Sequence, residues 1–181
     1  MSAGDLATVS SISDAVHGRF TERVAVYAER LALYPAGCRV LEQDGEVVGY
    51  LISHPWHRED PPKLGAGLGA IPADADSYYL HDIALLPAAR GTGAAKAALD
   101  FVKAQALALE FSDIALMAVG GADRYWTAPG VRLCPGRGGP VLWRRRVSDA
   151  RRGPYLTTGS ATSEPPHTRW VALTKSSGAA L

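Results

Sequence analysis

Cysteine is scarce in this sequence: there are two in 181 residues, Cys38 and Cys134, and they do not have a metal-binding spacing. This scarcity excludes a disulfide framework and a cysteine-based metal centre, and it suits a reducing compartment. Long apolar runs are also missing, since no segment approaches the roughly 20 residues that span a bilayer. The start, Met1-Ser2-Ala3-Gly4-Asp5, lacks the basic and apolar regions of a signal peptide. We therefore expect a soluble cytoplasmic protein with no membrane partner.

Net charge is also low, at +1, which gives no reason to expect a nucleic-acid partner. The charge is unevenly distributed, because residues 129–181 hold nine Lys/Arg and two Asp/Glu, whereas residues 1–128 hold ten and sixteen. A short basic run, Arg144-Arg145-Arg146, is typical of a solvated face. We predict a core of residues 1–128 and an atypical basic region of residues 129–181. That region is either the divergent end of the same domain or the product of a reading-frame change near residue 128.

Apolar periodicity predicts an α/β domain. Apolar residues recur at helical spacing over 21–33, and Asp44-Gly45 between two β-prone runs predicts a hairpin of 38–42 and 46–52. In the helix expected over 21–33, the polar side is formed by Glu22, Arg23, Glu29 and Arg30. The other elements that we expect are helices at 11–17 and 92–109 and strands at 78–86, 113–119, 141–143 and 170–173. In the helix expected over 92–109, one apolar stripe is formed by Ala95, Leu99, Val102 and Ala106.

The segment 54–76 is long, rich in proline and glycine and without periodicity, and loops of such length often carry function. Residues 65–70 fit the dinucleotide pattern Gly-x-Gly-x-x-Gly/Ala, but prolines on both sides favour a mobile loop. His54 and His57 lack helical ligand spacing and a nearby cysteine, so we expect no metal site there. Together with Trp56, these two histidines either line the pocket for a substrate or lie on a surface loop.

The most informative stretch joins a strand to a helix through Arg90-Gly91-Thr92-Gly93-Ala94-Ala95. Backbone N–H groups at the start of a helix lie at its positive end, where they bind phosphate. Glycines let this backbone approach a pyrophosphate closely. Arg90 can add charge, Thr92 can offer a hydroxyl, and the two alanines keep the first helical turn slim. The alternative is a flexible loop, but the strand before it and the helix after it favour phosphate binding.

The stretch resembles the Arg/Gln-x-x-Gly-x-Gly/Ala motif with which the GNAT superfamily of N-acyltransferases binds acyl-CoA. The hairpin, the central strand, the motif and the segment Ala122-Asp123-Arg124-Tyr125-Trp126 follow that family's order over residues 21–130. The resemblance implies a mixed, partly antiparallel central sheet flanked by helices, with acetyl-CoA as co-substrate and no metal. It also implies that Ile83, Ala84 and Leu85 line the pantetheine cleft, and that Arg90, Gly91, Thr92, Gly93, Ala94, Ala95 and Lys96 surround the pyrophosphate. Lys96 can equally be a solvated helix residue.

The resemblance further implies that a neutral amine attacks the thioester directly, aided by a strand N–H that stabilises the oxyanion and by a general base. Asp82 is the preferred base or water-positioning group, and His81 is the alternative because histidine suits proton relay near neutral pH. Strand neighbours point to opposite faces, so we expect only one of the two to see the cleft. Tyr125 is the candidate acid. However, Trp126 stands at the usual tyrosine position, so two buried aromatics are the competing interpretation.

These observations predict transfer of an acetyl group from acetyl-CoA to a primary amine. The alternative is a catalytically impaired or non-catalytic acyl-CoA-binding module of the same fold, suggested by Trp126 and by the helix-interrupting Pro129. No motif identifies the amine acceptor, because acceptor recognition lies in loops. Nor does the sequence indicate whether the chain forms a homo-oligomer.

Overall fold

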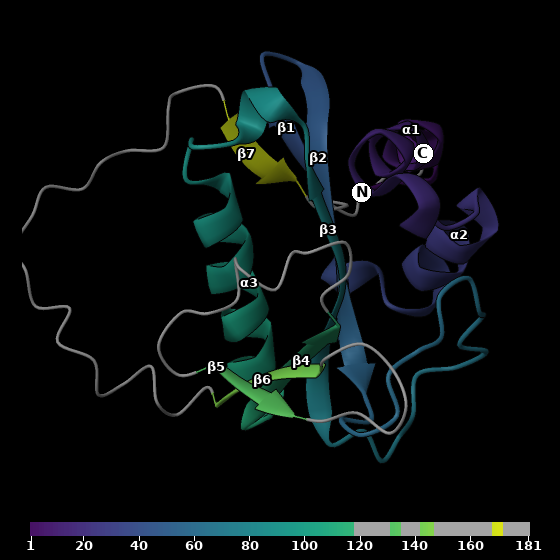
Figure 1. Ribbon diagram of the computed structural model, residues 1–181, viewed down its shortest axis with the longest axis vertical. Helices are drawn as coiled ribbons and strands as arrows, with labels where there is room; N and C mark the ends of the chain where they lie inside the picture. Colours follow the sequence, from purple (N-terminus) through teal and green to yellow (C-terminus); the bar gives the residue numbers. More distant parts are fainter. Residues whose placement is uncertain (118–130, 135–141, 147–167, 172–181) are drawn as a thin grey trace, which may run out of the picture.

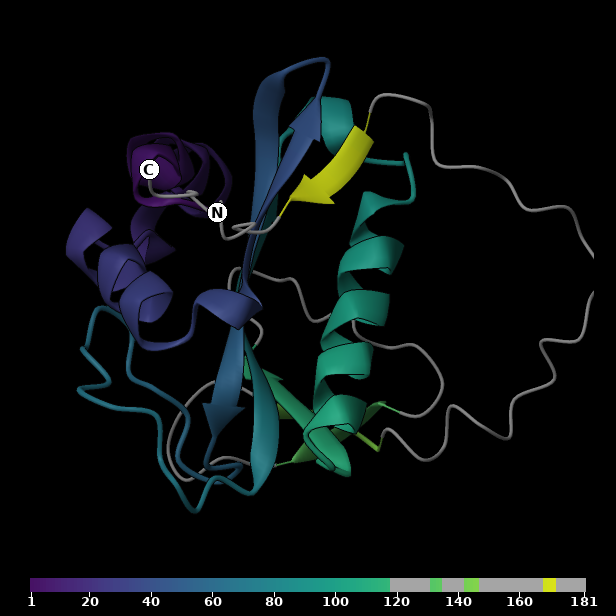
Figure 2. The same ribbon diagram turned by 180° about the vertical axis from the view of Figure 1, so that it is seen from behind.

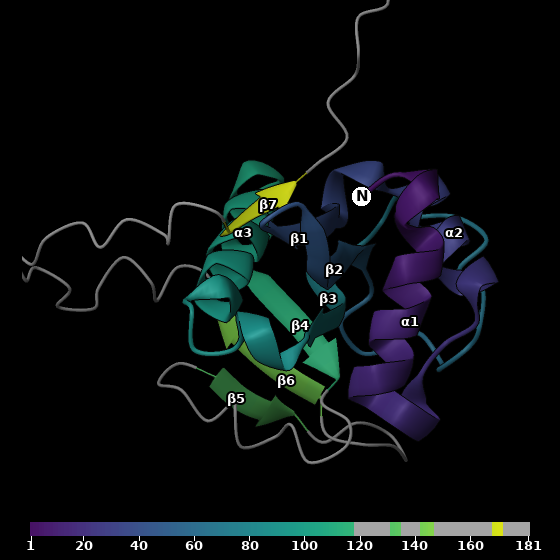
Figure 3. The ribbon, with the colours of Figure 1, turned by 90° about the horizontal axis from the view of Figure 1, so that it is seen from above.

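Seven described strands form one sheet that separates two layers of helices (Figures 1 and 3). The computed structural model describes residues 1–117, 131–134, 142–146 and 168–171. Helices α1 and α2 cover one face of the sheet and α3 covers the other, as the view from behind also shows (Figure 2). The helices are α1 (Leu6–His17), α2 (Val24–Leu33) and α3 (Ala94–Ala108). The strands are β1 (Cys38–Gln43), β2 (Glu46–Trp56), β3 (Ser77–Leu85), β4 (Asp113–Met117), β5 (Val131–Cys134), β6 (Leu142–Arg146) and β7 (Thr168–Val171).

The strand order β5-β6-β4-β3-β2-β1-β7 confirms the expected mixed sheet. β3 and β4 run parallel, whereas the other neighbouring pairs among these strands are antiparallel. The parallel pairing starts at Tyr78 and ends where Leu80 faces Leu116, although β3 continues to Leu85. Beyond Leu80, therefore, the part of the chain that the structure describes pairs with β3 only on its β2 side.

The β1–β2 hairpin forms where the sequence predicts it. Asp44 and Gly45 adopt φ values of 52° and 85°, the left-handed conformations that a two-residue turn of this kind requires. Strand β2 is longer than expected and pairs with β3 from Gly49 to Trp56. Helix α1 is also longer than the predicted 11–17, because it already begins at Leu6.

On one face of the sheet, residues of α1 and α2 pack against β2. The ring centroids of Tyr27 and Tyr50 lie 5.8 Å apart, and both side chains are buried together with Ile12. The polar side predicted for residues 21–33 is wrong at two positions, because Glu22 is 6% and Arg30 is 1% exposed. Buried charges are costly unless they are paired. These two residues therefore indicate a polar site between α2 and the sheet.

Helix α3, 15 residues long, packs on the opposite face. Its buried residues are Ala94, Ala98, Val102 and Ala106. The expected burial of Ala95 is wrong: Ala95 is exposed, because the apolar positions recur at every fourth residue from Ala94 onward. Among the described residues, no helix is long and apolar enough to cross a membrane.

The three C-terminal strands extend both edges of the sheet. β6 pairs with β4 and carries β5 at one edge, while β7 pairs with β1 at the other. β6 and β7 overlap the predicted strands at 141–143 and 170–173, whereas β5 was not expected. The division of the chain at residue 128 stays a prediction.

Gly37 provides a test of this packing. A Cβ atom at Gly37 would lie 1.8 Å from the carbonyl oxygen of Ser53, whose hydroxyl also donates a 3.1 Å hydrogen bond to the Gly37 carbonyl. Gly37→Ala should therefore lower the free energy of unfolding by about 1–3 kcal/mol or more, as overpacking does. Urea denaturation measures the change. Gly4→Ala is the control, because its Cβ would lie 3.6 Å from Ser2 Oγ, and equal midpoints for the two variants would contradict the prediction.

Candidate functional site

The junction between β3 and α3 has the backbone geometry of an anion cradle. A single turn of 3-10 helix, Pro87–Ala89, follows β3, and Gly91 and Gly93 then adopt φ values of 78° and 90°. A Cβ atom at either glycine would meet nothing within 4 Å, so the space beside this backbone is open. The N–H of Ala97 bonds to Gly93 O. The N–H groups of Ala95 and Lys96 therefore lie outside the helical hydrogen-bond ladder, and that of Ala94 donates to Thr92 Oγ1 at 3.4 Å.

The side chains of Thr92 and Arg90 donate hydrogen bonds to backbone carbonyl groups of the turn itself. Thr92 Oγ1 donates to Ala89 O at 2.8 Å, and the exposed Arg90 donates from Nε to Leu85 O at 3.2 Å. Lys96 is 82% exposed and pairs with Asp100 one helical turn further on, at 2.5 Å. The groups in this turn best placed to receive a phosphate are therefore the backbone N–H groups, with Arg90 at the rim.

The end of β3 carries residues for both faces of the sheet. Ile83 and Leu85 are half-buried and pack on the α3 side. Ala84 is buried on the opposite side, in the cluster of α1 and α2. Pairing with β4 has ended at Leu80, so among the described residues the edge of this segment on the β4 side has no strand partner.

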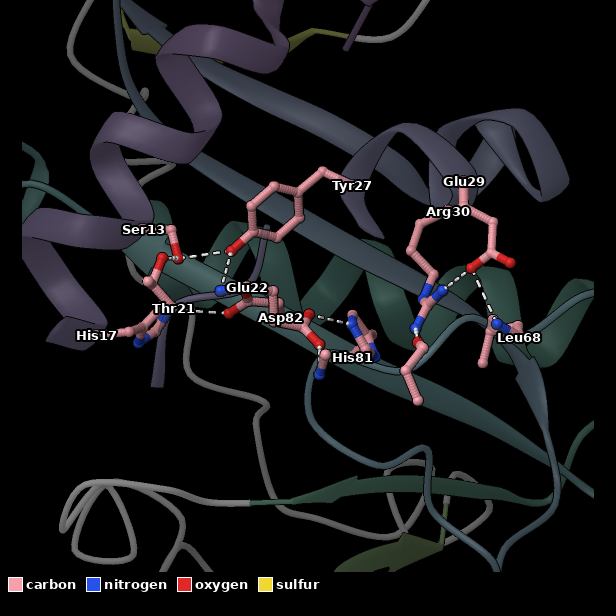
Figure 4. Close-up of polar contacts among 12 residues, drawn as sticks. Ser13, His17, Thr21, Glu22, Tyr27, Glu29, Arg30, Leu68, His81 and Asp82 are labelled. Carbon is pink, nitrogen blue, oxygen red and sulfur yellow. Dashed lines mark hydrogen bonds and ion pairs between the residues drawn. The ribbon is translucent and has the colours of Figure 1, made fainter. Parts of the chain in front are cut away.

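A β-bulge brings His81 and Asp82 to the same face. Ile52 of β2 faces Asp82, but the next residue, Ser53, faces Leu80, so His81 is an extra residue in β3. An extra residue breaks the alternation of side chains. His81 and Asp82 both point toward the layer of α1 and α2 (Figure 4). The expectation that they point to opposite faces is therefore wrong.

His81 is paired with Glu22, which lies just before α2. Nε2 of His81 lies 2.9 Å from Glu22 Oε2, and both side chains are less than a tenth exposed. The other oxygen of Glu22 accepts a 2.6 Å hydrogen bond from the N–H of Gly65. Burial acts to raise the pKa of Glu22, but the His81 contact and the Gly65 N–H outweigh it and lower the pKa. Glu22 is therefore an ionised carboxylate that only accepts, so the His81 proton in this contact lies on Nε2.

Asp82 forms a second pair with His17 at the end of α1. Nε2 of His17 lies 2.8 Å from Asp82 Oδ1, and Tyr50 donates its hydroxyl proton to Oδ2 at 2.5 Å. At this distance His17 and Asp82 form an ion pair whenever the His17 ring is protonated. Burial acts to lower the pKa of His17, but Asp82 raises it above the ordinary 6.5. Burial, followed by the charge of Asp82, raises the pKa of Tyr50.

Hydrogen bonds between α1 and α2 hold Glu22 in place (Figure 4). The Glu22 N–H donates to the hydroxyl of Tyr27 at 3.2 Å, and that hydroxyl donates to Ser13 Oγ at 2.6 Å. Thr21 also donates to Ser13 Oγ, at 2.8 Å. The backbone that leads into α2 is therefore fixed by buried groups on both helices.

Residues of α2 also hold residues 65–70, the glycine-rich loop between β2 and β3. Arg30 pairs with Glu29 and donates to Ala66 O at 2.8 Å. The Glu29 carboxylate accepts hydrogen bonds from the N–H groups of Leu68 and Gly69, each at 2.9 Å. Because these N–H groups bind the protein's own carboxylate, the segment 65–70 does not form a nucleotide cradle.

His54 and His57 do not come together. His54 is 1% exposed, and burial lowers its pKa to about 3, so it is a neutral core residue beside His81. His57 is 38% exposed and lies 3.6 Å from Asp74, while half-buried Trp56 donates its indole N–H to Asp60 O at 2.7 Å. Within the described residues, no group of three His, Cys, Asp or Glu side chains could hold a metal ion.

Sequence reasoning missed the partners of the predicted residues. Glu22 is 59 positions from His81 and was assigned to a polar helix side, and neither His17 nor Tyr50 was singled out. The sequence of a polar helix face does not indicate which of its charged residues is buried. Tyr125 lies outside the described residues and stays a candidate.

Comparison with known proteins agrees with the fold. The model of the acetyltransferase (GNAT) family matches residues 9–125, and no curated protein matches the chain. The GNAT-like decarboxylase GphF in complex with isobutyryl-CoA superimposes with a TM-score of 0.67 at 17% identity, covering 81% of this chain and 97% of that chain. The loading GNATL domain of CurA from Lyngbya majuscula gives 0.67 at 12%, covering 82% and 96%. Naa20 of Chaetomium thermophilum, in complex with a bisubstrate analogue, gives 0.60 at 17%, covering 84% and 87%.

The His17–Asp82 pair predicts a pH dependence of stability. The pKa of His17 is raised in the folded protein, so its contribution to stability is complete below the unfolded pKa of about 6.5 and is lost as the pH rises through the folded pKa. His17→Asn should therefore lower the urea midpoint more at about pH 6 than at about pH 9. His57→Asn, at a more exposed histidine, is the control. An equal loss for His17→Asn at both pH values would refute the assignment.

Proposed function

The chain belongs to the GNAT acetyltransferase family, and on that premise we propose that it transfers an acetyl group from acetyl-CoA to a primary amine. The observation that carries the proposal is the double use of β3. This one strand leads into the cradle at its end and carries His81 and Asp82 at its bulge. The groups that we assign to the donor and those that we assign to the acceptor therefore lie on, or directly after, the same strand.

The donor fits the α3 side of the sheet. The left-handed glycines leave open space, and the N–H groups of the first turn of α3 are directed at an incoming anion, which suits the pyrophosphate of CoA. The pantetheine chain then follows the edge of β3 beyond Leu80, where β3 pairs only with β2 among the described residues, so that a backbone N–H of β3 can polarise the thioester carbonyl. Side chains contribute little to this half of the site.

The acceptor fits the opposite face, where His81 and Asp82 lie. With Nε2–H donating to Glu22, the other ring nitrogen of His81 carries a lone pair that can take a proton from the amine. The amine nitrogen forms a bond to the thioester carbon, the carbon–sulfur bond breaks, and the thiolate takes up a proton. Asp82 uses both oxygens, for His17 and Tyr50. We therefore assign the base to His81 and a positioning role to Asp82, and Tyr125 stays the candidate acid.

The alternative is an acyl-CoA-binding module without transfer, suggested by Trp126 at the usual tyrosine position. Two structural neighbours are named as a decarboxylase and as a loading domain, so proteins of this fold are not all named for transfer to an amine. Donor binding and acetyl transfer are therefore tested separately.

Donor binding is tested by thermal shift with acetyl-CoA and with free CoA. Binding at about 100 times Kd should stabilise the protein by about 2.7 kcal/mol, or roughly 5–10 °C in Tm. Gly93→Glu should abolish the shift by filling the cradle with a negative side chain. Gly45→Glu is the matched control, because Gly45 has a similar φ of 85° and equal space but lies in the hairpin turn. A shift that survives Gly93→Glu would place the donor elsewhere.

Acetyl transfer is tested by release of free thiol from acetyl-CoA in the presence of a panel of primary amines. His81→Asn should lower kcat for the best amine by about 100- to 10,000-fold, as loss of a general base does, while leaving the acetyl-CoA thermal shift intact. His57→Asn is the control. No thiol release with any amine, together with a normal thermal shift, would favour the non-catalytic module.

A further inference from the structure

Glu22 is a buried carboxylate whose two oxygens contact different parts of the site. One oxygen lies 2.9 Å from His81 on β3, and the other accepts from the N–H of Gly65 at 2.6 Å. Glu22 itself is held by Tyr27 of α2. One side chain therefore joins three segments: the connection between α1 and α2, the bulge of β3 and the glycine-rich loop (Figure 4).

We propose that Glu22 is a positioning residue that fixes both the proton on His81 and the loop beside the acceptor site. The proposal rests on the proposed function, because it assumes that His81 serves the acceptor. It adds a residue that touches neither substrate and acts through its two partners.

The first partner is fixed through the tautomer of His81. An ionised carboxylate accepts hydrogen bonds and donates none, so Glu22 keeps the proton of neutral His81 on Nε2. The lone pair is then left on Nδ1, and the ring is oriented by the same bond. A carboxylate that orients a catalytic histidine in this way selects one tautomer without taking the substrate proton itself.

The second partner is fixed through the backbone of the loop. Gly65 has a φ of 74°, and this left-handed conformation accompanies the hydrogen bond from its N–H to Glu22. Arg30 holds the next residue, Ala66, by its carbonyl. Glu29 anchors the same loop further on, at Leu68 and Gly69. The loop therefore has two carboxylate anchors, of which Glu22 is the one that pairs with His81.

The charges around Glu22 agree with an ionised state. His81 and the Gly65 N–H stabilise the carboxylate, and the charge of Arg30 also interacts with it. Asp82 acts in the opposite direction, but it is itself paired with His17. Among the described groups, the hydrogen bonds from His81 and Gly65 and the charge of Arg30 thus favour the carboxylate, and Glu22 accepts at both oxygens.

The test compares Glu22→Gln with Glu29→Gln, which removes the other anchor but leaves the His81 contact. Nitrogen NMR of labelled histidines reports the tautomer, and amide hydrogen exchange reports each anchor. In the parent protein, neutral His81 should carry its proton on Nε2. Glu22→Gln should mix the tautomers and speed exchange at Gly65, while Glu29→Gln should speed exchange at Leu68 and Gly69 and leave the tautomer unchanged.

Kinetics supply a further readout, with acetyl-CoA and the best amine of the panel. Glu22→Gln should lower kcat by about 10- to 100-fold, a size typical of lost orienting contacts, and raise the KM for the amine. Glu29→Gln should affect only that KM.

Two results would overturn the proposal: a parent His81 protonated on Nδ1, or a tautomer that Glu22→Gln leaves unchanged. The first needs no variant, so it holds even if Glu22→Gln fails to fold. If the parent releases no thiol with any amine, the proposed function fails. The tautomer and exchange measurements still decide whether Glu22 positions His81 and the loop.

Discussion

The site depends on how β3 leaves its neighbours. Pairing with β4 stops at Leu80, and the next residue, His81, is an extra residue opposite β2. These two irregularities have different consequences. The first leaves the edge of β3 on the β4 side without a strand partner among the described residues, and the second turns His81 and Asp82 together toward α1 and α2. A regular strand of the same sequence would place them on opposite faces, so a single misfit in register creates the polar side of the site.

Burial of this polar side is tolerated because the charges are arranged as pairs. Glu22 faces His81, and Asp82 faces His17, so each carboxylate has an imidazole and a second donor. A buried carboxylate without such partners would be costly. The same pairing rigidifies the site, because each group loses a hydrogen bond if its partner moves. Arg30, a charge buried to 1% exposure, pairs with Glu29 and donates to the loop carbonyl of Ala66.

Local features of the chain were predictable from the sequence, and long-range ones were not. Asp44-Gly45 specifies its own turn, and Arg90-Gly91-Thr92-Gly93 specifies a helix start, because both depend on the conformations that a few adjacent residues allow. The bulge at His81 depends instead on register against β2. The burial of Glu22 depends on a contact 59 positions away, and no periodicity within 21–33 distinguishes it from exposed Arg23. The identity of the paired residues thus required the packed structure.

The two halves of the site use different chemistry, and this has a consequence for specificity. The cradle consists mainly of backbone N–H groups, whose positions depend on φ angles and on two glycines, so the donor binding that we propose there would depend on a phosphate group and not on the acyl chain or the acceptor. The opposite face is built from side chains of α1, α2, β3 and the loop, and each can change without disturbing the cradle. A change of acceptor would therefore require substitutions around Glu22 and the glycine-rich loop, while the sheet and the start of α3 stay as they are.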